Sequence, residues 1–520
     1  MTNTSDPKAL NSRQGTVYLV GSGPGDPRLI TVRGLELLRR ADVVLHDQLS
    51  HMALLDECPA TAELRDVGKR GGKKSPSQGW ITAQLIELAE QGRDVVRLKG
   101  GDSFIFARGA EEAEALSRAG VRFEVIPGIS SPVATSAYAG ISLTHRDFSS
   151  SVTFITGSDK VGKAWSPEAW QRLATATATI CVLMGMRRIK EICDAIIDGG
   201  RSPETPAAVI QWGARPQQRV LTAPLSELAE RSKAGGFSNP AVIVVGEVVS
   251  LRETLSWFEK KPLFSKRVLV PRPKQQARAT AHLLRERSAE PVVFPMISIV
   301  DPPDLAPLRT AISKLASYDL VLFTSANGVG RFFSELAAQG GDARAFGSAK
   351  VGVIGPKTAE ALREHGITPD LEAREFVGEG LLTAIEKAGK FERVLLARGL
   401  VGRAQVPDAL KLTGASVEVV PVYETLPVGA EAGSSLFAMF EAKELDCVLF
   451  TSSSTVHSMV EVLGDRAREC LSGVVVASIG PITSEACREN GIEPDLIATE
   501  YTVPGLLDAL EQHYLSQAPS

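Results

Sequence analysis

Two glycine-rich segments in the first half of the chain have the composition of loops that bind a small ligand. The first runs from Tyr18 to Pro27 as YLVGSGPGDP, and the second runs from Arg97 to Phe106 as RLKGGDSFIF. Glycine permits sharp turns and lets the main chain approach a ligand closely. Asp102 adds a carboxylate that can accept hydrogen bonds from ribose hydroxyls or an amino group. Each segment is equally compatible with an ordinary turn. In the second segment, Asp102 would then cap a helix.

The first segment does not match the fingerprint of a dinucleotide-binding fold. Pro24 interrupts the first segment, and its third glycine comes too early for GxGxxG. The sequence therefore disfavours a pyrophosphate cradle. Two further glycine-punctuated segments, Ile126–Ser131 and Gln211–Arg219, have a similar loop-like composition.

The second half of the chain has hydroxyl-rich segments instead. Thr324–Ser325 and Thr451–Ser454 follow apolar runs, whereas Gly355–Thr358 and Gly480–Thr483 precede helical patterns. Hydroxyls and free amides at helix N-termini favour bound anions. No histidine, cysteine or paired carboxylate accompanies them in the sequence, so the pattern predicts a site that binds and shapes a polyanion. Thr358 and Thr483 can alternatively be helix N-caps.

The segments between these motifs alternate between strand and helix patterns. This alternation predicts α/β layers with largely parallel sheets, in which ligands bind at the carboxyl ends of the strands. Thr31 is a predicted helix cap. The predicted strands include Val17–Val20, Val43–Leu45, Val95–Leu98, Val152–Ile155, Thr179–Met184 and Ala241–Val245, and the predicted helices include Val32–Arg40, Thr82–Gln91 and Ala110–Ala119.

The second half also contains an internal duplication. Val351–Leu371 matches Val476–Leu496 at 14 of 21 positions, with an offset of 125 residues. Val268-Leu-Val-Pro-Arg272 similarly echoes Val394-Leu-Leu-Ala-Arg398. A period this long exceeds the roughly 20–50 residues of a solenoid repeat. The duplication predicts two similar α/β domains.

Composition excludes several classes of protein. The net charge of −4 gives no basic surface for nucleic acid. The six cysteines include no CxxC pair and the seven histidines are dispersed, so no metal site is expected. Residues 1–15 are polar and form a predicted flexible tail, not a secretory signal, and no apolar run approaches the roughly 20 residues of a membrane span. We expect a cytoplasmic protein without a membrane partner.

Taken in order, the loop segments between Gly15 and Arg252 resemble the uroporphyrinogen III C-methyltransferases of the tetrapyrrole methylase family. The resemblance implies two α/β lobes, S-adenosyl-L-methionine as the methyl donor with S-adenosyl-L-homocysteine as its product, and a homodimer formed through this half. It places the family's proton acceptor on Asp47 and its proton donor on Lys69, with a purely structural ion pair as the alternative. The implied cofactor-binding residues are Pro24, Gly100, Gly101, Asp102, Ile105, Ser130, Ser131, Met184 and Gly213.

The segments between Lys266 and Leu510 resemble uroporphyrinogen III synthase. That family cyclises hydroxymethylbilane and inverts ring D. The resemblance implies that Tyr423 assists the loss of hydroxide, although Tyr423 can equally be a packing aromatic. The residues implied to hold substrate carboxylates are Thr324, Ser325, Thr358, Ser452, Ser453 and Thr483.

The two resemblances together define the expected architecture. It is an α/β protein with an N-terminal two-lobed tetrapyrrole methylase fold, followed by two segment-swapped flavodoxin-like α/β domains of the uroporphyrinogen III synthase type. Hinges are expected at Ile299–Pro303 and Glu424–Pro427. The predicted limits are a tail at 1–15, a methyltransferase at 16–257 with lobes 16–127 and 128–251, a linker at 258–265, and a synthase at 266–515 with lobes 266–300 plus 427–515 and 304–422.

Both halves point to one pathway, because the product of the synthase is the substrate of the methyltransferase. Two methyl transfers would give precorrin-2, on the branch to sirohaem and cobalamin. Two alternatives remain open. The methyltransferase can act on another tetrapyrrole intermediate, or the C-terminal half can be a non-catalytic sensor for a tetrapyrrole or other anion.

Overall fold

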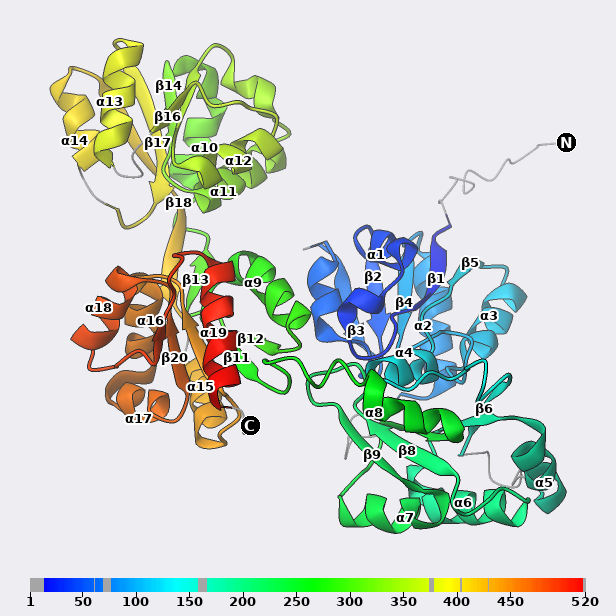
Figure 1. Cartoon of the computed structure of the whole chain (residues 1–520). Coiled ribbons are helices and arrows are strands. Elements are labelled where there is room, and N and C mark those ends of the chain that lie inside the picture. Colours follow the sequence, from blue (N-terminus) through cyan, green and yellow to red (C-terminus); the bar gives the residue numbers. More distant parts are fainter. Residues whose placement is uncertain are drawn as a thin grey trace, which may run out of the picture. The chain divides into compact units, whose positions relative to one another are not determined.

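The computed structural model describes residues 14–59, 61–68, 76–157, 166–373, 378–402, 405–428 and 430–517 (Figure 1). The chain divides into two compact units. One comprises residues 1–268, 282–291 and 510–520, and the other comprises residues 269–281 and 292–509. Within the described residues the strands form four sheets, two before residue 250 and two after residue 266.

The first sheet has the order β3-β2-β4-β1-β5, and its paired strands are all parallel. Alternate side chains of β1 pack against α2 and α3 on one face and against α1 on the other. Covering both faces explains why the central strands are apolar runs. Its strands are β1 (Thr16–Gly21), β2 (Val43–His46), β3 (Glu63–Asp66), β4 (Val95–Lys99) and β5 (Arg122–Ile126), and its helices are α1 (Val32–Leu38), α2 (Gln78–Glu90) and α3 (Gly109–Arg118).

The second sheet has the order β6-β7-β10-β8-β9 and is mixed. Only β6 and β7 pair in parallel, because β10 runs antiparallel to both β7 and β8. Helices α5, α6 and α7 cover one face. The strands are β6 (Val152–Thr156), β7 (Thr179–Leu183), β8 (Pro206–Gln211), β9 (Arg219–Pro224) and β10 (Ala241–Val245), and the helices are α4 (Ser131–Tyr138), α5 (Pro167–Ala176), α6 (Ile189–Asp198), α7 (Leu225–Ala234) and α8 (Arg252–Leu255).

The third sheet, of order β12-β11-β19-β20-β21, is built from two separate stretches of chain. Between β12 and β19 the chain forms the whole of the fourth sheet, which is the segment exchange expected from the sequence. The strands are β11 (Arg267–Val270), β12 (Glu290–Val293), β19 (Cys447–Phe450), β20 (Val475–Ser478) and β21 (Leu496–Ile497), and the helices are α9 (Lys274–Glu286), α15 (Ala430–Glu441), α16 (Ser453–Leu463), α17 (Ala467–Leu471), α18 (Pro481–Glu489) and α19 (Val503–Gln517).

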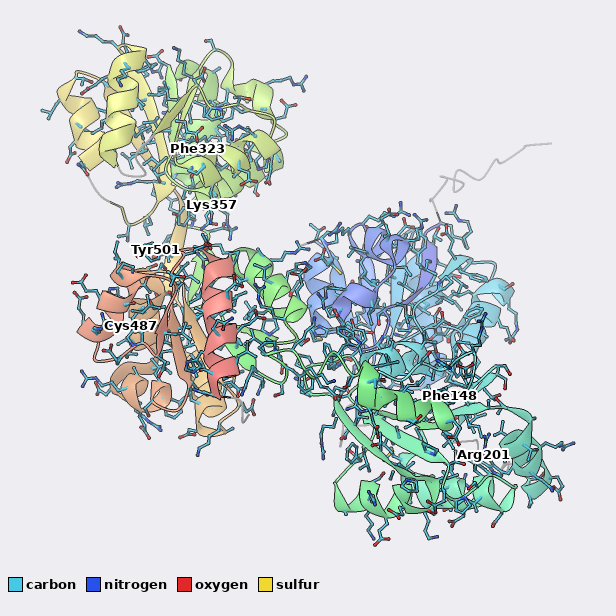
Figure 2. All side chains as sticks on the ribbon, in the orientation of Figure 1. Phe148, Arg201, Phe323, Lys357, Cys487 and Tyr501 are labelled. Carbon is cyan, nitrogen blue, oxygen red and sulfur yellow. The ribbon has the colours of Figure 1, made fainter. Side chains whose placement is uncertain are left out.

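The fourth sheet has the order β13-β18-β17-β14-β15-β16. β13 pairs antiparallel with β18, so parts of both expected hinges lie in regular strands, with Ile299 opposite Thr425. Phe323, labelled in Figure 2, ends β14 in the core of this sheet. The strands are β13 (Ile297–Val300), β14 (Leu320–Phe323), β15 (Lys350–Ile354), β16 (Leu371–Ala373), β17 (Arg393–Gly399) and β18 (Ser416–Pro427), and the helices are α10 (Ala306–Ser313), α11 (Ala326–Ala338), α12 (Pro356–Glu364), α13 (Gly378–Ala388) and α14 (Gln405–Leu412).

The predicted strands and helices are present with small shifts at their ends, and the largely parallel α/β fold is confirmed, with the second sheet and the β13–β18 pair as exceptions. Thr31 is confirmed as the cap of α1, since its side chain accepts a hydrogen bond from Gly34. In the part of the chain that the structure describes, no helix combines the length and apolar character needed to cross a bilayer.

Candidate functional site

The two glycine-rich segments of the first half pair directly with each other at the carboxyl ends of β1 and β4. The backbone N–H of Gly23 donates to the carbonyl of Gly101 at 3.1 Å, and the N–H of Gly101 donates to the carbonyl of Gly23 at 3.0 Å. Both residues have positive φ angles, +70° and +73°. Glycine adopts this backbone conformation without the steric cost that a side chain would add.

Asp102 connects this paired segment to the loop after β5. Its Oδ1 accepts from the backbone N–H of Phe104 at 2.8 Å, and its Oδ2 accepts from the N–H of Gly128 at 2.9 Å. The carboxylate therefore fixes two loops. It does not cap a helix, because α3 begins later, with Arg108 as its N-cap residue.

The loop after β8, in the second sheet, also approaches the first glycine-rich segment. A Cβ added to Gly25 would lie 2.5 Å from the carbonyl oxygen of Gly213. A Cβ added to Gly213 would lie 2.4 Å from Cβ of Thr135, on α4. These backbones meet at distances that only glycine allows.

A cavity of about 430 Å³ lies where these loops meet. Two of its residues, Met184 and Trp212, have positive φ angles of +56° and +53°. Such backbone strain in non-glycine residues is concentrated at functional sites. The cavity is lined by Pro24, Gly25, Leu49, Gly100, Gly101, Ser131, Thr135, Leu183, Met184, Ile210, Trp212, Gly213, Arg215, Asn239, Pro240, Ala241 and Val242.

Six of the nine predicted cofactor-binding residues line this cavity: Pro24, Gly100, Gly101, Ser131, Met184 and Gly213. The other three do not line it. Asp102 holds the loops in place, Ser130 is the N-cap residue of α4, and Ile105 is 41% exposed in the loop before α3.

Asp47 lies in the loop after β2, at the same edge of the sheet, and its neighbour Leu49 lines the cavity. Its carboxylate accepts from Arg97 Nη2 at 2.6 Å. Lys69, the expected charge partner, lies outside the described residues.

Arg97 belongs to a buried charge cluster under this edge. Its Nε donates to Glu112 Oε1 at 3.3 Å, and Lys99 Nζ lies 3.1 Å from Glu112 Oε2. The Glu112 side chain is completely buried. Burial, together with the nearby Arg97, lowers the pKa of the Lys99 ammonium. The four charges of Asp47, Arg97, Lys99 and Glu112 balance, which makes their burial tolerable.

In the fourth sheet, the predicted residues Thr324, Ser325 and Tyr423 come together. Ser325 Oγ donates to the Tyr423 hydroxyl at 3.1 Å and also caps α11. Thr324 and Tyr423 line a cavity of about 190 Å³. Tyr423 therefore combines a polar contact with its packing against Gly399, where an added Cβ would lie 3.1 Å from the ring.

The helix-cap interpretation of Thr358 and Thr483 is wrong. The N-caps of α12 and α18 are Gly355 and Gly480, and both threonines are buried within the first turns of those helices. The fixed φ of proline suits the first helical position, so each helix begins at the proline, before the threonine. Tyr501 is labelled in Figure 2. Its ring lies against Gly480, 3.0 Å from a Cβ added to that glycine.

Ser452 and Ser453 lie at the start of α16. Ser452 is its N-cap residue, and its Oγ lies 2.9 Å from Ser454 Oγ. Ser453 Oγ donates to the carbonyl of Ile482, beside the start of α18. The four predicted hydroxyl residues Thr358, Ser452, Ser453 and Thr483 thus all lie at helix N-termini.

Comparison with known proteins agrees with the division into two halves. The family model "Tetrapyrrole (Corrin/Porphyrin) Methylases" matches residues 16–229, and "Uroporphyrinogen-III synthase HemD" matches residues 278–508. The porphyrin biosynthesis protein HemD of Ruminiclostridium josui is 37% identical over 95% of this chain and 97% of its own length. The chain belongs to this family of fused tetrapyrrole methylases and uroporphyrinogen-III synthases.

Other relatives match parts of this fused enzyme. The uroporphyrinogen-III C-methyltransferase of Bacillus subtilis is 37% identical over 73% of this chain and 78% of its own length. The siroheme synthase of Stutzerimonas stutzeri is 49% identical over 49% of this chain, which spans about half of that relative. A crystal structure of uroporphyrin-III C-methyl transferase from Thermus thermophilus with S-adenyl homocysteine is 36% identical, covers 46% of this chain and all of the other, and has a TM-score of 0.39.

Sequence reasoning missed several residues of the methylase cavity. Arg215 Nη2 donates to the carbonyl of Leu49 at 3.1 Å, and its guanidinium lies 5.3 Å from the Trp212 ring centroid. Burial lowers the pKa of Arg215. Trp212 and Arg215 belong to the glycine-punctuated segment Gln211–Arg219, so that segment was the available signal. Thr135 and Asn239 belong to no motif and are brought in only by the tertiary fold.

Proposed function

We propose that this chain catalyses two successive steps of tetrapyrrole biosynthesis. The C-terminal half cyclises hydroxymethylbilane to uroporphyrinogen III with inversion of ring D. The N-terminal half methylates that product twice with S-adenosyl-L-methionine, releasing S-adenosyl-L-homocysteine and giving precorrin-2. Family membership supports both activities. The observation that carries the methyltransferase assignment is the single cavity that collects glycine loops from both N-terminal sheets.

The residues present fit the proposed cofactor. The cavity volume falls within the roughly 300–1,000 Å³ of small-molecule sites. Gly25, Gly100 and Gly101 let a ligand approach the main chain without meeting a side chain, while Leu183, Ile210 and Val242 offer apolar surface for a purine ring. When bound, S-adenosyl-L-methionine supplies an electrophilic methyl group. Asp102, Ile105 and Ser130 remain proposed cofactor-binding residues outside the cavity lining.

The residues of the chain have distinct proposed roles in methyl transfer. Asp47 takes up the proton that the macrocycle loses after methylation, and Lys69 is the proposed proton donor. Arg97 orients the Asp47 carboxylate through the contact of 2.6 Å. A positioned acid or base of this kind contributes about 10²–10⁴-fold to a rate.

In the synthase half, the proposed task is to fold a flexible polycarboxylate. Tyr423 assists the departure of hydroxide from the linear substrate, supported by its hydrogen bond from Ser325. Substrate carboxylates accept hydrogen bonds from hydroxyls and free amides at the helix N-termini. The residues proposed to hold them are Thr324, Ser325, Thr358, Ser452, Ser453 and Thr483.

We further propose that the enzyme works in the cytoplasm, without metal or nucleic acid, as a homodimer through its methyltransferase half. All six cysteines are free thiols, in keeping with a reducing compartment. Consecutive apolar side chains at Phe104, Ile105 and Phe106 are 47%, 41% and 42% exposed, and burial against a second copy would cover them. Light scattering tests the dimer, and assay with a chelator tests independence from metal.

The decisive experiment supplies the full-length chain with hydroxymethylbilane and methyl-labelled S-adenosyl-L-methionine and identifies the tetrapyrrole formed. We expect a type III macrocycle carrying two labelled methyl groups. Formation of isomer I alone, as in the absence of enzyme, would show that the C-terminal half is a sensor. Failure to methylate added uroporphyrinogen III would assign the methyltransferase to another tetrapyrrole.

A further inference from the structure

The duplication in the synthase half places an arginine at matching positions in two sheets. Arg398 lies near the carboxyl end of β17, and Arg272 follows the carboxyl end of β11 by two residues. Both side chains are half-buried. The flanking sequences VLLAR and VLVPR show that the two positions correspond.

Both arginines flank the point at which the strand order of their sheet reverses. Numbered by the duplicated sequence, β12-β11-β19-β20-β21 and β18-β17-β14-β15-β16 have the same order, 2-1-3-4-5. In such sheets ligands bind outside the carboxyl ends of strands 1 and 3, where the order switches. In each case the arginine lies at the carboxyl end of strand 1, within β17 or two residues beyond β11. Strand 3 is followed by Thr451 in the first sheet and Thr324 in the second.

The geometry around Arg398 is that of a small polar site. β14 and β17 are parallel, with Phe323 opposite Ala397, so Thr324 and Arg398 are next to each other in the register. The pairing of β17 with β18 is irregular between Arg398 and Gly399, and such bulges redirect side chains beside active sites. Arg398, Thr324, Tyr423 and Gln405 are the polar residues around the cavity of about 190 Å³.

The matching position in the third sheet has two features that suit a carboxylate ligand. Burial alone lowers the pKa of the Arg272 guanidinium, with no carboxylate contributing to the shift. The Oγ1 atom of Thr451 is buried, and among the described residues it has no hydrogen-bond partner. Buried polar atoms in native proteins are nearly always paired, and this hydroxyl is available to a group from outside the protein.

We propose that Arg272 and Arg398 are paired anchors for two carboxylate side arms of the tetrapyrrole, each working with the threonine beside it. The inference rests on the proposed synthase function and adds two cationic contacts to the hydroxyl residues already assigned. Guanidinium binds a carboxylate through two parallel hydrogen bonds, which fixes the orientation of the arm as well as its position. Holding two arms of one flexible chain restricts the conformations from which ring D can close.

The test measures synthase kinetics of full-length Arg398→Gln and Arg272→Gln. We expect each substitution to raise KM for hydroxymethylbilane at least tenfold, with a smaller change in kcat, and to increase the fraction of isomer I. Arg398→Lys keeps the charge but not the paired hydrogen bonds, so it should recover part of the loss. Arg344→Gln is the matched control, because that side chain is 91% exposed and paired with Asp342. Methylation of added uroporphyrinogen III by each variant shows whether its N-terminal half is intact.

Thr451→Val provides a test that does not depend on losing a charge. Removing a buried hydroxyl without a protein partner should leave the melting temperature unchanged or higher, while KM rises. A purely structural hydroxyl would give the opposite result, a lower melting temperature with an unchanged KM, and would overturn the proposal. Wild-type KM and isomer ratio in both Gln variants would also overturn it. If the unaltered chain made no isomer III, the synthase function itself would fail instead.

Discussion

Asp47 joins a buried charge cluster to the edge of the methylase cavity. Asp47→Asn removes its charge but keeps an oxygen that can accept from Arg97, so we expect the fold and S-adenosyl-L-homocysteine affinity to persist. Loss of this proposed proton acceptor should reduce kcat for methylation of uroporphyrinogen III by about 10²–10⁴-fold. Steady-state kinetics and calorimetric titration measure the two quantities. Asp198→Asn, an exposed position in the same half, is the control, and equal turnover by both variants would remove Asp47 from the mechanism.

Asp26 ties the first glycine loop to α4. It accepts from Arg28 Nη2 at 2.6 Å and from the Tyr138 hydroxyl at 2.9 Å. Burial alone would raise the pKa of Asp26, but hydrogen bonds from Arg28 and Tyr138 outweigh burial and hold the pKa below its usual value. A lowered pKa contributes stability that is present above the unfolded pKa, about 3.9, and disappears as the pH falls through the folded value.

Asp26→Asn should therefore destabilise the methylase half near neutral pH but not in strong acid. Charged hydrogen bonds of this kind contribute about 1.5–3 kcal/mol each, so we expect the melting temperature to fall by about 3–10 °C at pH 6. The gap from the unaltered chain should close as the pH drops below about 3.9. Scanning calorimetry can follow the transition that S-adenosyl-L-homocysteine shifts upward. A gap that stays constant down to pH 3 would contradict the role assigned to the charge.

At the scale of elements, the cavity of the methylase half depends on strand ends whose backbones touch. Gly101→Ala and Gly120→Ala both place a side chain at positive φ, +73° and +68°. That strain costs about 1–2 kcal/mol in each. Only at Gly101 does the added Cβ meet a neighbour, Ser131 Oγ at 2.9 Å, whereas nothing lies within 4 Å at Gly120. We expect similar melting temperatures for the two variants but at least tenfold weaker S-adenosyl-L-homocysteine binding for Gly101→Ala alone, measured by calorimetric titration. Equal affinity in the two would mean that this loop does not touch the cofactor.

The same elements explain what the sequence could predict. Glycine loops after apolar strands are local patterns, and parallel strands bring their carboxyl ends to one edge, so the segments of Pro24 and Gly101 were predictable neighbours. Met184 was predicted only through the resemblance to the tetrapyrrole methylases. Thr135 and Asn239 carry no such local pattern. Thr135 lies on α4 and Asn239 lies just before β10, so only the folded chain brings them to the cavity. The buried cluster of Arg97, Lys99 and Glu112 was equally hidden, since charged residues are nearly always exposed unless paired. The prediction that Thr358 and Thr483 are helix N-caps was wrong because the Gly-Pro pair before each threonine makes the helix begin earlier.

At the scale of the whole molecule, each half has its own cavity and its own core. Neither proposed reaction requires a residue of the other half. One chain inactivated in methyl transfer and another inactivated in cyclisation should therefore complement each other in solution. This expectation separates transfer of uroporphyrinogen III through solvent from transfer confined to a single chain.

The experiment mixes Asp47→Asn with the double variant Arg272→Gln/Arg398→Gln and supplies hydroxymethylbilane with S-adenosyl-L-methionine. Alone, with hydroxymethylbilane well below the raised KM of the double variant, the first should accumulate uroporphyrinogen III, and the second should methylate little beyond the uroporphyrinogen III that is added. Together they should form the dimethylated product, at a rate that rises with the concentration of the second variant, because the intermediate must diffuse to it. Chromatography of the tetrapyrroles identifies the product of each variant alone and of the mixture. If each variant keeps its remaining activity but the mixture gives no dimethylated product, the intermediate does not leave the chain that makes it, and the two halves act as one site in kinetic terms.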